Sequence, residues 1–560
     1  MNMNHTARLA LALTALGLFA SCAKKPVPAE PQVARLPTVG ETTILGPFTG
    51  HDAPLHPDNL SPHRLAYYGT DLGFSYEHQG QIHFLFGDTA ATEKGGPIEA
   101  SSKGLYDDSF GTIPVADWPD PSQITPANLP LIRLGQNAGT TEMSAINVGR
   151  PMEGFKTPVG GFSNGADQYG LFYFSKLQGC RTDGDCGGSS CDSGLGYLGE
   201  RYDDDRGLTF ACLDGAPGCN AETMAPVKGA APAPSGFCVD RTSSAWADTP
   251  VGRMSAVVVK NLIGVRSADD PRIYTGIREW LTSKFANVAA RTARGFDPAR
   301  GAGSANQDYR IADGVGGAQR VLLWGRPGFV GVKARGRSLG LYFAYADMPA
   351  GADFTWKPRY YTGTDANGVA QFSDDERDAA AVDLDSTQAG VQAVEEHDIV
   401  DHTSVSWVEP LGKWVMFYGG GLVDLPTPIF ANCGVLELFA RDECREVVMG
   451  NGAIRMRTAD DPWGPWSPPQ DVLVGGDPHG SPPEHQFAAG GILRHPDCTE
   501  PGCADSTEWD GVNPREYGFL YGVNIIEQWT RPAGDGVDIL WNLSTWNPYR
   551  VVLARTRINR

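Results

Sequence analysis

The most informative segment of the chain, residues 69 to 89, reads GTDLGFSYEHQGQIHFLFGDT. Two runs rich in apolar and aromatic residues flank Gln79-Gly80, a dipeptide suited to a two-residue turn, so the segment predicts a β-hairpin. In that register Phe74 faces Leu85, and Tyr76 faces His83. The segment therefore predicts antiparallel β structure.

The same register places two carboxylates, Asp71 and Asp88, opposite each other at one end of the hairpin. Directly opposed side chains share a face of the sheet, with Cβ atoms about 4.5 to 5.5 Å apart. Like charges at this spacing are unfavourable unless they share a proton, bind a cation or face a ligand, so the pair is a candidate functional site. The alternative is that each aspartate caps a loop, and a turn one residue longer would change the register.

The rest of the chain repeats this pattern of short apolar or alternating runs. Gly (69) and Pro (41) make up about a fifth of the 560 residues, which indicates many turns. The best helical candidate is residues 278–290, where Leu281, Phe285 and Val288 form an i, i+4, i+7 stripe. Repeated hairpins with little helix favour an all-β propeller, with a two-sheet sandwich as the alternative. Runs that predict strands are residues 72–76, 81–86, 169–174, 320–324, 338–345, 405–408, 413–418, 517–521, 537–543 and 550–555.

The N-terminus predicts export. Residues 9–19 are apolar, and Ala20-Ser21-Cys22 follows, which resembles a bacterial lipoprotein signal with Cys22 as the lipidated residue. Lys24 rather than an aspartate lies close behind, which suggests an outer-membrane anchor facing the periplasm or the cell surface. An ordinary secretory signal is the alternative. We therefore expect a signal peptide over residues 1–21, a tether over 22–40 and the propeller over 41–560.

Charge limits the possible partners. The chain carries 46 basic and 66 acidic residues, a formal net charge of −20. Nucleic acid is an unsuitable partner, because it needs a basic face that this chain lacks. The membrane contact is expected through the N-terminal lipid alone, and the protein is expected to be a monomer.

The cysteines also fit an exported protein. Without Cys22 they number ten, an even count that predicts five disulfides in an oxidising compartment. We expect local pairing: Cys433 with Cys444, Cys498 with Cys503, and three bridges within an insertion over residues 180–240. A zinc site is the alternative, but no Cys-x-x-Cys pair is present. The cysteines of the insertion are Cys180, Cys186, Cys191, Cys212, Cys219 and Cys238.

No cofactor is expected to be required. A structural calcium ion is compatible with the acidic residues of the insertion, although EF-hand spacing is missing. These residues are Asp183, Asp185, Asp203, Asp204 and Asp205.

A set of motifs in fixed order resembles a bacterial family known as domain-of-unknown-function family 4185. The first are the GTDLG of residues 69–73 and the FGDT of residues 86–89. The resemblance covers most of residues 60–558 and implies a five-bladed β-propeller. Some members are similar to glycoside hydrolase family 183, which cleaves D-arabinan, so it also implies an endo-D-arabinanase-like activity. The further motifs are residues 157–161, 321–331, 356–363, 372–376, 404–418, 457–467 and 543–549.

Glycoside cleavage needs one carboxylic acid to protonate the leaving oxygen and one carboxylate to activate water or attack the sugar. We assign Asp71 as base or nucleophile and Asp88 as the group that orients it or holds a proton. The acid is expected from Glu396 or Asp398, in an acidic segment just before a predicted strand. The alternative for that segment is a solvated loop.

Other residues are weaker candidates for substrate binding, each with a structural alternative such as a turn, a hydrogen bond or blade packing. We expect at least half of the tryptophans Trp463, Trp466, Trp541 and Trp546 to pack within blades rather than stack on sugars. The expected function is a lipoprotein glycoside hydrolase acting on a cell-wall or environmental polysaccharide; the alternative is a non-catalytic propeller that binds glycan or protein. The substrate-binding candidates are Asp108, His402, Glu484, His485 and Trp546.

Overall fold

The computed structural model shows a chain built almost entirely of β-strands joined by turns and short 3₁₀ helices. Within the described ranges, no helix has the length and hydropathy that a membrane span needs. The structure describes residues 36–50, 53–59, 69–90, 107–117, 120–135, 146–148, 156–177, 179–192, 197–203, 207–213, 224–227, 236–243, 246, 256–293, 319–327, 340–348, 354–382, 384, 399–420, 453–474, 520–545 and 550–560.

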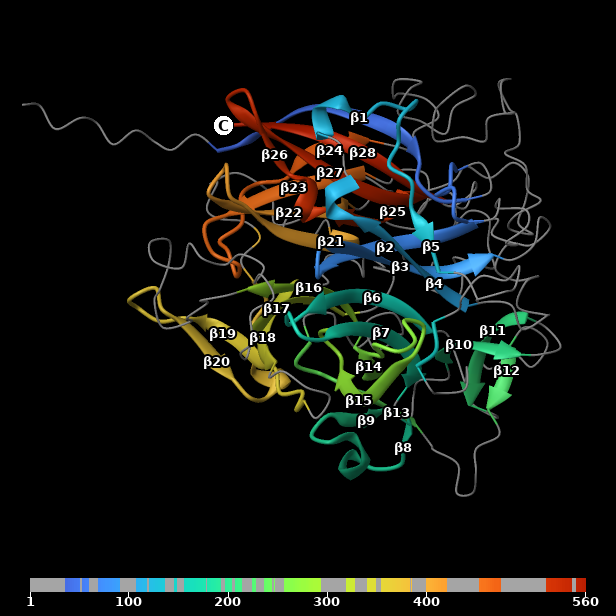
Figure 1. Cartoon of the computed structure of the whole chain (residues 1–560). Helices are drawn as coiled ribbons and strands as arrows, with labels where there is room; N and C mark the ends of the chain where they lie inside the picture. The colour runs from blue at the N-terminus through green and yellow to red at the C-terminus, as the bar shows by residue number, and fades with distance from the viewer. Residues whose placement is uncertain are drawn as a thin grey trace, which may run out of the picture. The chain divides into compact units, whose positions relative to one another are not determined.

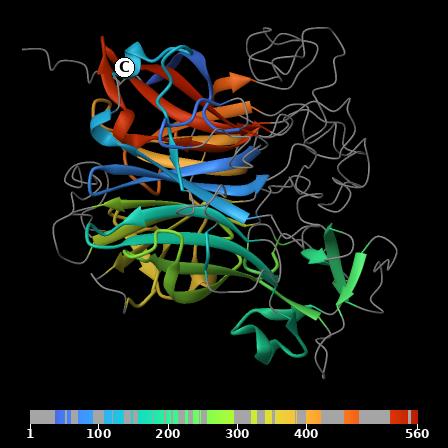
Figure 2. The ribbon, with the colours of Figure 1, turned by 45° about the vertical axis from the view of Figure 1, so that its right-hand side comes forward.

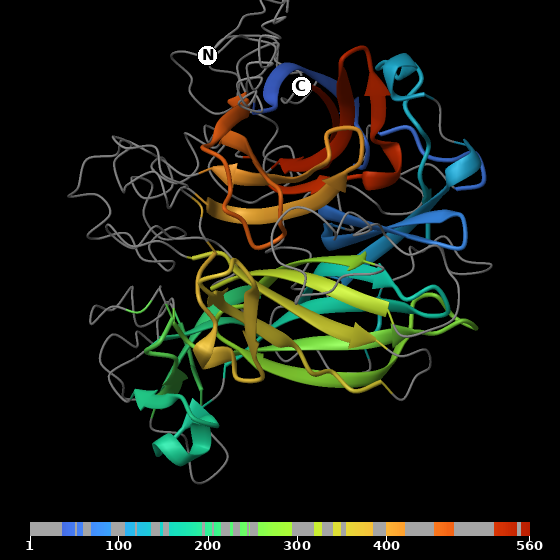
Figure 3. The ribbon, with the colours of Figure 1, turned by 90° about the vertical axis from the view of Figure 1, so that its left-hand side faces the viewer.

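Five antiparallel sheets of four or five strands make up most of the described chain (Figure 1). Blade 1 contains β2 (Gly69–His78), β3 (Gln81–Ala90), β4 (Asp107–Pro114) and β5 (Arg133–Leu134). Blade 2 contains β6 (Lys156–Ser163), β7 (Gln168–Leu177), β14 (Val259–Arg266) and β15 (Tyr274–Thr282). Blade 3 contains β16 (Asn287–Ala293), β17 (Gln319–Arg326), β18 (Tyr342–Met348), β19 (Arg359–Thr364) and β20 (Ala370–Ser373), which Figure 3 shows side by side.

The last two blades complete the set. Blade 4 contains β21 (Ile399–Val408), β22 (Lys413–Gly420), β23 (Ala453–Ala459) and β24 (Gln470–Val474). Blade 5 contains β25 (Leu520–Ile525), β27 (Gly536–Thr545), β28 (Arg550–Asn559) and the N-terminal β1 (Thr38–Pro47), with β26 (Arg531–Ala533) beside β27. Because β1 pairs with β28, the first and last described strands share one sheet. Strand β1, which begins at Thr38, therefore belongs to blade 5.

The first strand of each blade contacts the first strands of two other blades. Strand β2 contacts β6, β6 contacts β16, β16 contacts β21, β21 contacts β25, and β25 contacts β2. These contacts close a ring, as the inner strands of a propeller do around its axis. The predicted all-β propeller is therefore confirmed, with five blades among the described residues.

The core of the first hairpin has the predicted register. Gln79 and Gly80 have φ angles of 48° and 75°, as a two-residue type I′ turn requires. Phe74 pairs with Leu85. Tyr76 likewise pairs with His83, and the rings of these two residues stack at 5.2 Å.

The predicted opposition of Asp71 and Asp88 is wrong. Asp71 pairs with Gly87, because the register shifts between Leu72 and Phe74. Leu72 and the glycine after it have φ angles of 66° and 82°, so the chain forms a bulge that local alternation does not reveal.

The predicted helix over residues 278–290 is also wrong. Its residues belong to the end of β15, a short connection and the start of β16. Trp280, Phe285 and Val288 are buried in one cluster, whereas Leu281 is 47% exposed. The helical spacing is therefore coincidental, because Leu281 faces away from the core that Phe285 of the connection and Val288 of β16 enter.

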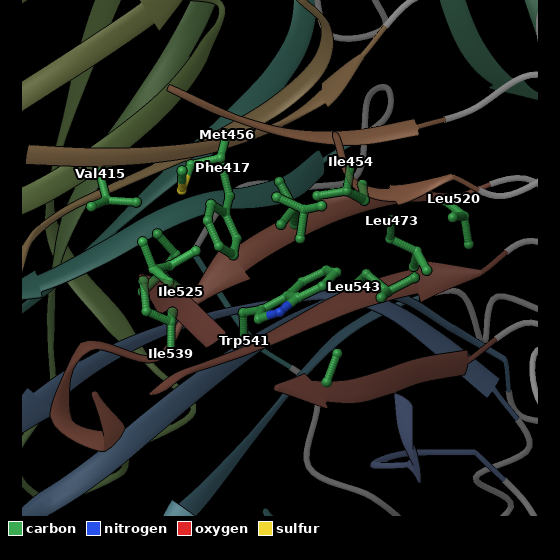
Figure 4. Close-up of a cluster of buried hydrophobic side chains, with 14 of the residues drawn as sticks. Val415, Phe417, Ile454, Met456, Leu473, Leu520, Ile525, Ile539, Trp541 and Leu543 are labelled. Carbon is green, nitrogen blue, oxygen red and sulfur yellow. The ribbon is translucent and has the colours of Figure 1, made fainter. Parts of the chain in front are cut away.

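Apolar clusters fill the space between neighbouring blades. Figure 4 shows one of them, formed by side chains of blades 4 and 5 around Trp541. Trp463, Trp466 and Trp541 are each at most 2% exposed, so these three tryptophans serve packing, as the structural alternative predicted. Trp546 lies outside the described residues.

The cysteine-rich insertion forms two small sheets outside blade 2, shown in green in Figure 2. Disulfides join Cys180 to Cys191 and Cys186 to Cys238, which confirms local pairing for these four cysteines. The side chains of Cys212, Cys219, Cys433, Cys444, Cys498 and Cys503 lie outside the described residues. The sheets comprise β8 (Gly179–Cys180), β9 (Ser190–Asp192) and β13 (Gly236–Val239), and β10 (Tyr197–Asp203), β11 (Gly207–Leu213) and β12 (Met224–Val227).

A buried arginine joins the inner strands. Arg291 lies on β16 and is 9% exposed. Its guanidinium donates to the Ser75 carbonyl of β2 (3.4 Å), to the Ser404 and Ser406 hydroxyls of β21 (3.1 and 3.2 Å), and to the Ile525 carbonyl of β25 (3.1 Å). One side chain thus connects four of the five blades.

We predict that Arg291→Met lowers the free energy of unfolding by about 3 kcal/mol, because it leaves several buried acceptors unpaired. Urea unfolding measures this change. The matched control is Arg320→Met, which removes a surface pair with Asp347 that is worth less than about 1 kcal/mol. Equal losses for the two variants would contradict a special role for Arg291.

Candidate active site at the start of the inner strands

Side chains from three blades meet at one end of the propeller axis. Tyr521 and Thr157, near the starts of β25 and β6, both approach Asp71 near the start of β2. The connections at this end are long, such as residues 91–106 between β3 and β4 and residues 421–452 between β22 and β23. The opposite end has tight turns such as Gln79-Gly80, but it also has long connections, such as residues 294–318 between β16 and β17. The Asp71 end is the candidate site because strands of three blades bring polar side chains together there around one carboxylate.

Asp71 is a nearly buried carboxylate, 6% exposed. Its Oδ2 accepts a hydrogen bond from the Tyr521 hydroxyl at 2.8 Å. Its Oδ1 lies above Gly87, where an added Cβ would come within 2.6 Å of that oxygen and within 2.5 Å of the Thr157 Oγ1. Three inner strands therefore surround one carboxylate, and the glycine of β3 leaves the space that it occupies.

The backbone beside Asp71 is held in an unusual conformation. Leu72 is one of two non-glycine residues with positive φ in the described chain. Its N–H donates to the Ser544 Oγ at 2.6 Å, and its carbonyl accepts from the Asn542 Nδ2 at 2.8 Å, so β27 supports the bulge. Non-glycine residues with positive φ are strained and persist only where the surrounding structure stabilises them. Such residues concentrate at functional sites.

Other buried ionisable groups occur at this end of the strands. Asp108, near the start of β4, is 1% exposed, and so is His402, near the start of β21. The centroid of the His402 ring lies 5.5 Å from that of the Phe74 ring, so His402 contacts a side chain of β2, the inner strand that carries Asp71. Arg326 at the end of β17 is also buried. The structure thus brings the predicted residues Asp71, Asp108 and His402 to the same end of the propeller.

Several predicted site residues cannot be placed. Only the backbone of Asp88 is described, within the irregular stretch of β3 between the paired residues Phe86 and Thr89. The candidates that lie outside the described residues are Glu396, Asp398, Glu484, His485 and Trp546.

Three residues of the site were missed by sequence reasoning. Thr157 lies in a segment quoted for the family resemblance, and Tyr521 ends a predicted strand, but neither carried a signal of its own. The third is Gly87, whose lack of a side chain matters only because Asp71 lies above it. All three became visible through contacts between strands.

The opposite end of the axis holds a second carboxylate. A pocket of about 10 Å³, roughly the space of one water, lies between Glu77, Ser163, Arg291 and Glu527. The Glu527 Oε2 lies 3.9 Å from the Arg291 Nε. Burial raises the pKa of Glu527 to about 7, with Arg291 opposing this shift and Glu77 adding to it. The pocket is too small for a sugar ring.

We predict that Glu527 makes the fold less stable as pH rises. Its folded pKa of about 7 exceeds the ordinary value of 4.5, so its contribution is complete below pH 4.5 and is lost as pH passes through 7. By the pKa difference, the contribution is at most about 3 kcal/mol. Denaturant unfolding across this range should show a flatter pH dependence for Glu527→Gln than for wild type.

The difference in unfolding free energy between wild type and Glu527→Gln reports the contribution of Glu527 alone. His83, whose pKa is lowered well below 6.5 by burial, changes stability in the opposite direction but is common to both. Parallel curves for wild type and variant would show that Glu527 ionises normally.

Comparisons with known proteins add little. No family model matches the chain, and no curated protein matches it. Similar solved structures include an α-L-arabinofuranosidase from Podospora anserina in complex with cellotriose, with 11% identity, a TM-score of 0.30, and coverage of 94% of this chain and 98% of that chain. A GH62 hydrolase in complex with xylotriose has 9% identity, a TM-score of 0.34, and coverage of 92% and 97%. A mutant sialidase from Trypanosoma rangeli has 8% identity, a TM-score of 0.28, and coverage of 93% and 60%.

Scores this low carry no argument about function. The resemblance to family 4185 and to the arabinan-cleaving enzymes therefore stays a prediction. What can be said of the site rests on the geometry around Asp71.

Proposed function

We propose that this protein is a glycoside hydrolase in which Asp71 acts as general base or nucleophile on a cell-wall or environmental polysaccharide. The observation that carries the proposal is a carboxylate enclosed by three inner strands beside a left-handed Leu72. Hydrogen bonds to the ionised form of a carboxylate favour that form, and the Tyr521 hydroxyl supplies one. A base or nucleophile must be ionised to act.

The acid partner must come from the Asp71 end. Productive carboxyl pairs lie about 5 to 9.5 Å apart. Tyr521, which contacts Asp71, lies four positions before Ile525 in strand β25, so their Cα atoms are about 13 Å apart. Because Glu527 lies beyond Ile525 on the same chain, it is too far away despite its raised pKa. We assign the acid to Glu396 or Asp398, which precede β21 and hence the buried His402.

D-Arabinan is the first substrate to test, because the resemblance described above suggests it. A panel of plant and mycobacterial cell-wall polysaccharides extends the test to related furanose and pyranose polymers. Release of reducing ends reports cleavage, and retention on immobilised glycan reports binding. A glycan that binds without cleavage would instead support a lectin-like propeller.

We predict that Asp71→Asn lowers turnover of the cleaved glycan by about 10²- to 10⁴-fold while glycan binding survives. The amide keeps the shape of the side chain but cannot accept a proton or attack carbon. Asp88→Asn should also lower turnover. The control is Asp374→Asn, a change at an exposed carboxylate of blade 3, which should leave turnover unaltered. A folded Asp71→Asn protein with more than about a tenth of wild-type turnover would exclude a chemical role.

We also propose that the protein is exported and held at the outer membrane through Cys22. The support is the lipoprotein-like sequence before that cysteine, together with the two disulfides of the insertion. Detergent phase partitioning should find wild type in the detergent phase and Cys22→Ser in the aqueous phase. Recovery of the variant with the detergent would place the anchor elsewhere.

A further inference from the structure

The two oxygens of Asp71 have different surroundings. Oδ1 has almost no accessible surface and lies above the Cα of Gly87, next to the Thr157 hydroxyl. Oδ2 accepts the Tyr521 hydroxyl, and the Tyr521 side chain is partly exposed. Of the two oxygens, Oδ2 is therefore the one that contacts a partly exposed side chain.

The geometry points to Tyr521 as the positioning residue of Asp71, the group that holds Oδ2 toward the substrate and favours its ionised form. This inference rests on the proposed function and specifies how its site works. A carboxylate oxygen has two lone pairs, so Oδ2 can accept the phenol with one and a proton from water with the other. The phenol keeps its own proton throughout. When Asp71 acts as base, one proton passes from water to Asp71 as the water oxygen bonds to the anomeric carbon; the glycosidic bond breaks, and its oxygen takes a proton from the acid partner.

Gly87 of β3 fixes the position of the other carboxylate oxygen, Oδ1. Any side chain at this position would press on Oδ1 at 2.6 Å, a distance that real Cβ contacts essentially never show. The carboxylate can rest on β3 only because residue 87 has no Cβ. Its orientation is thus set from one side by Tyr521 of β25 and from the other by the backbone of β3.

We expect Tyr521→Phe to lower kcat by about 10- to 100-fold, the rate equivalent of one hydrogen bond to a charged group, with a smaller effect on KM. The acidic limb of the pH profile of kcat/KM should move to higher pH, because the carboxylate loses a donor that favours its charged form. Gly87→Ala should also lower kcat, because the methyl group displaces Oδ1. A structural role alone would not move the acidic limb.

The matched control is Tyr360→Phe. This change removes one hydrogen bond, from the Trp280 Nε1 to the Tyr360 Oη at 3.2 Å, within the core near blade 3. It should lower stability while leaving the pH profile in place. If wild type cleaves a glycan and Tyr521→Phe loses less than about twofold with an unmoved acidic limb, the inference is overturned.

A second measurement tests the contact even if no glycan is cleaved. Urea unfolding of Asp71→Asn, Tyr521→Phe and the double variant forms a double-mutant cycle. Non-additive losses that disappear in acid support the contact with an ionised Asp71, and a lack of cleavage then counts against the proposed function only. Additive losses at every pH overturn the inference whatever the protein catalyses.

Discussion

A single buried cation, Arg291, ties the inner strands of the propeller together. Packing between blades is mostly apolar, whereas the inner strands also present backbone and hydroxyl groups that need partners. The Arg291 guanidinium meets this need for β2, β21 and β25 at once. Asn524 extends the same network by donating to the Ser75 hydroxyl and to the Asn542 side chain. The ring of inner strands is thus held by polar contacts that no individual blade could make.

The two ends of the propeller axis differ in what their side chains do. At the Arg291 end the side chains leave room for about one water, so that end serves the fold. At the other end the chain places a carboxylate, a phenol and a bulge together. The strain at Leu72 is tolerated because Ser544 and Asn542 satisfy its backbone groups. A rigid ring can therefore support a strained site at one end of its axis.

Local sequence patterns predicted most strands of the first hairpin region correctly but did not predict the β-bulge or the strands of residues 278–290. The turn at Gln79-Gly80 and the pairing of Phe74 with Leu85 follow from turn chemistry and period-two alternation. The bulge at Leu72 does not, because one extra residue shifts the register without altering composition. The helix predicted over residues 278–290 is wrong because its apolar spacing is coincidental: Leu281 of β15 is exposed, whereas Phe285 and Val288 enter the core from the connection and from β16.

What the sequence determined by itself was the all-β class, the core of the first hairpin and the pairing of cysteines within the insertion. These depend on residues near one another in the chain, so propensity and spacing reveal them. Only the tertiary structure decided which residues surround Asp71. Tyr521 lies 450 positions away and reaches it because the ring brings the first and last blades together. Contacts between blades are set by closure of the ring, and no local pattern encodes which strand ends will meet.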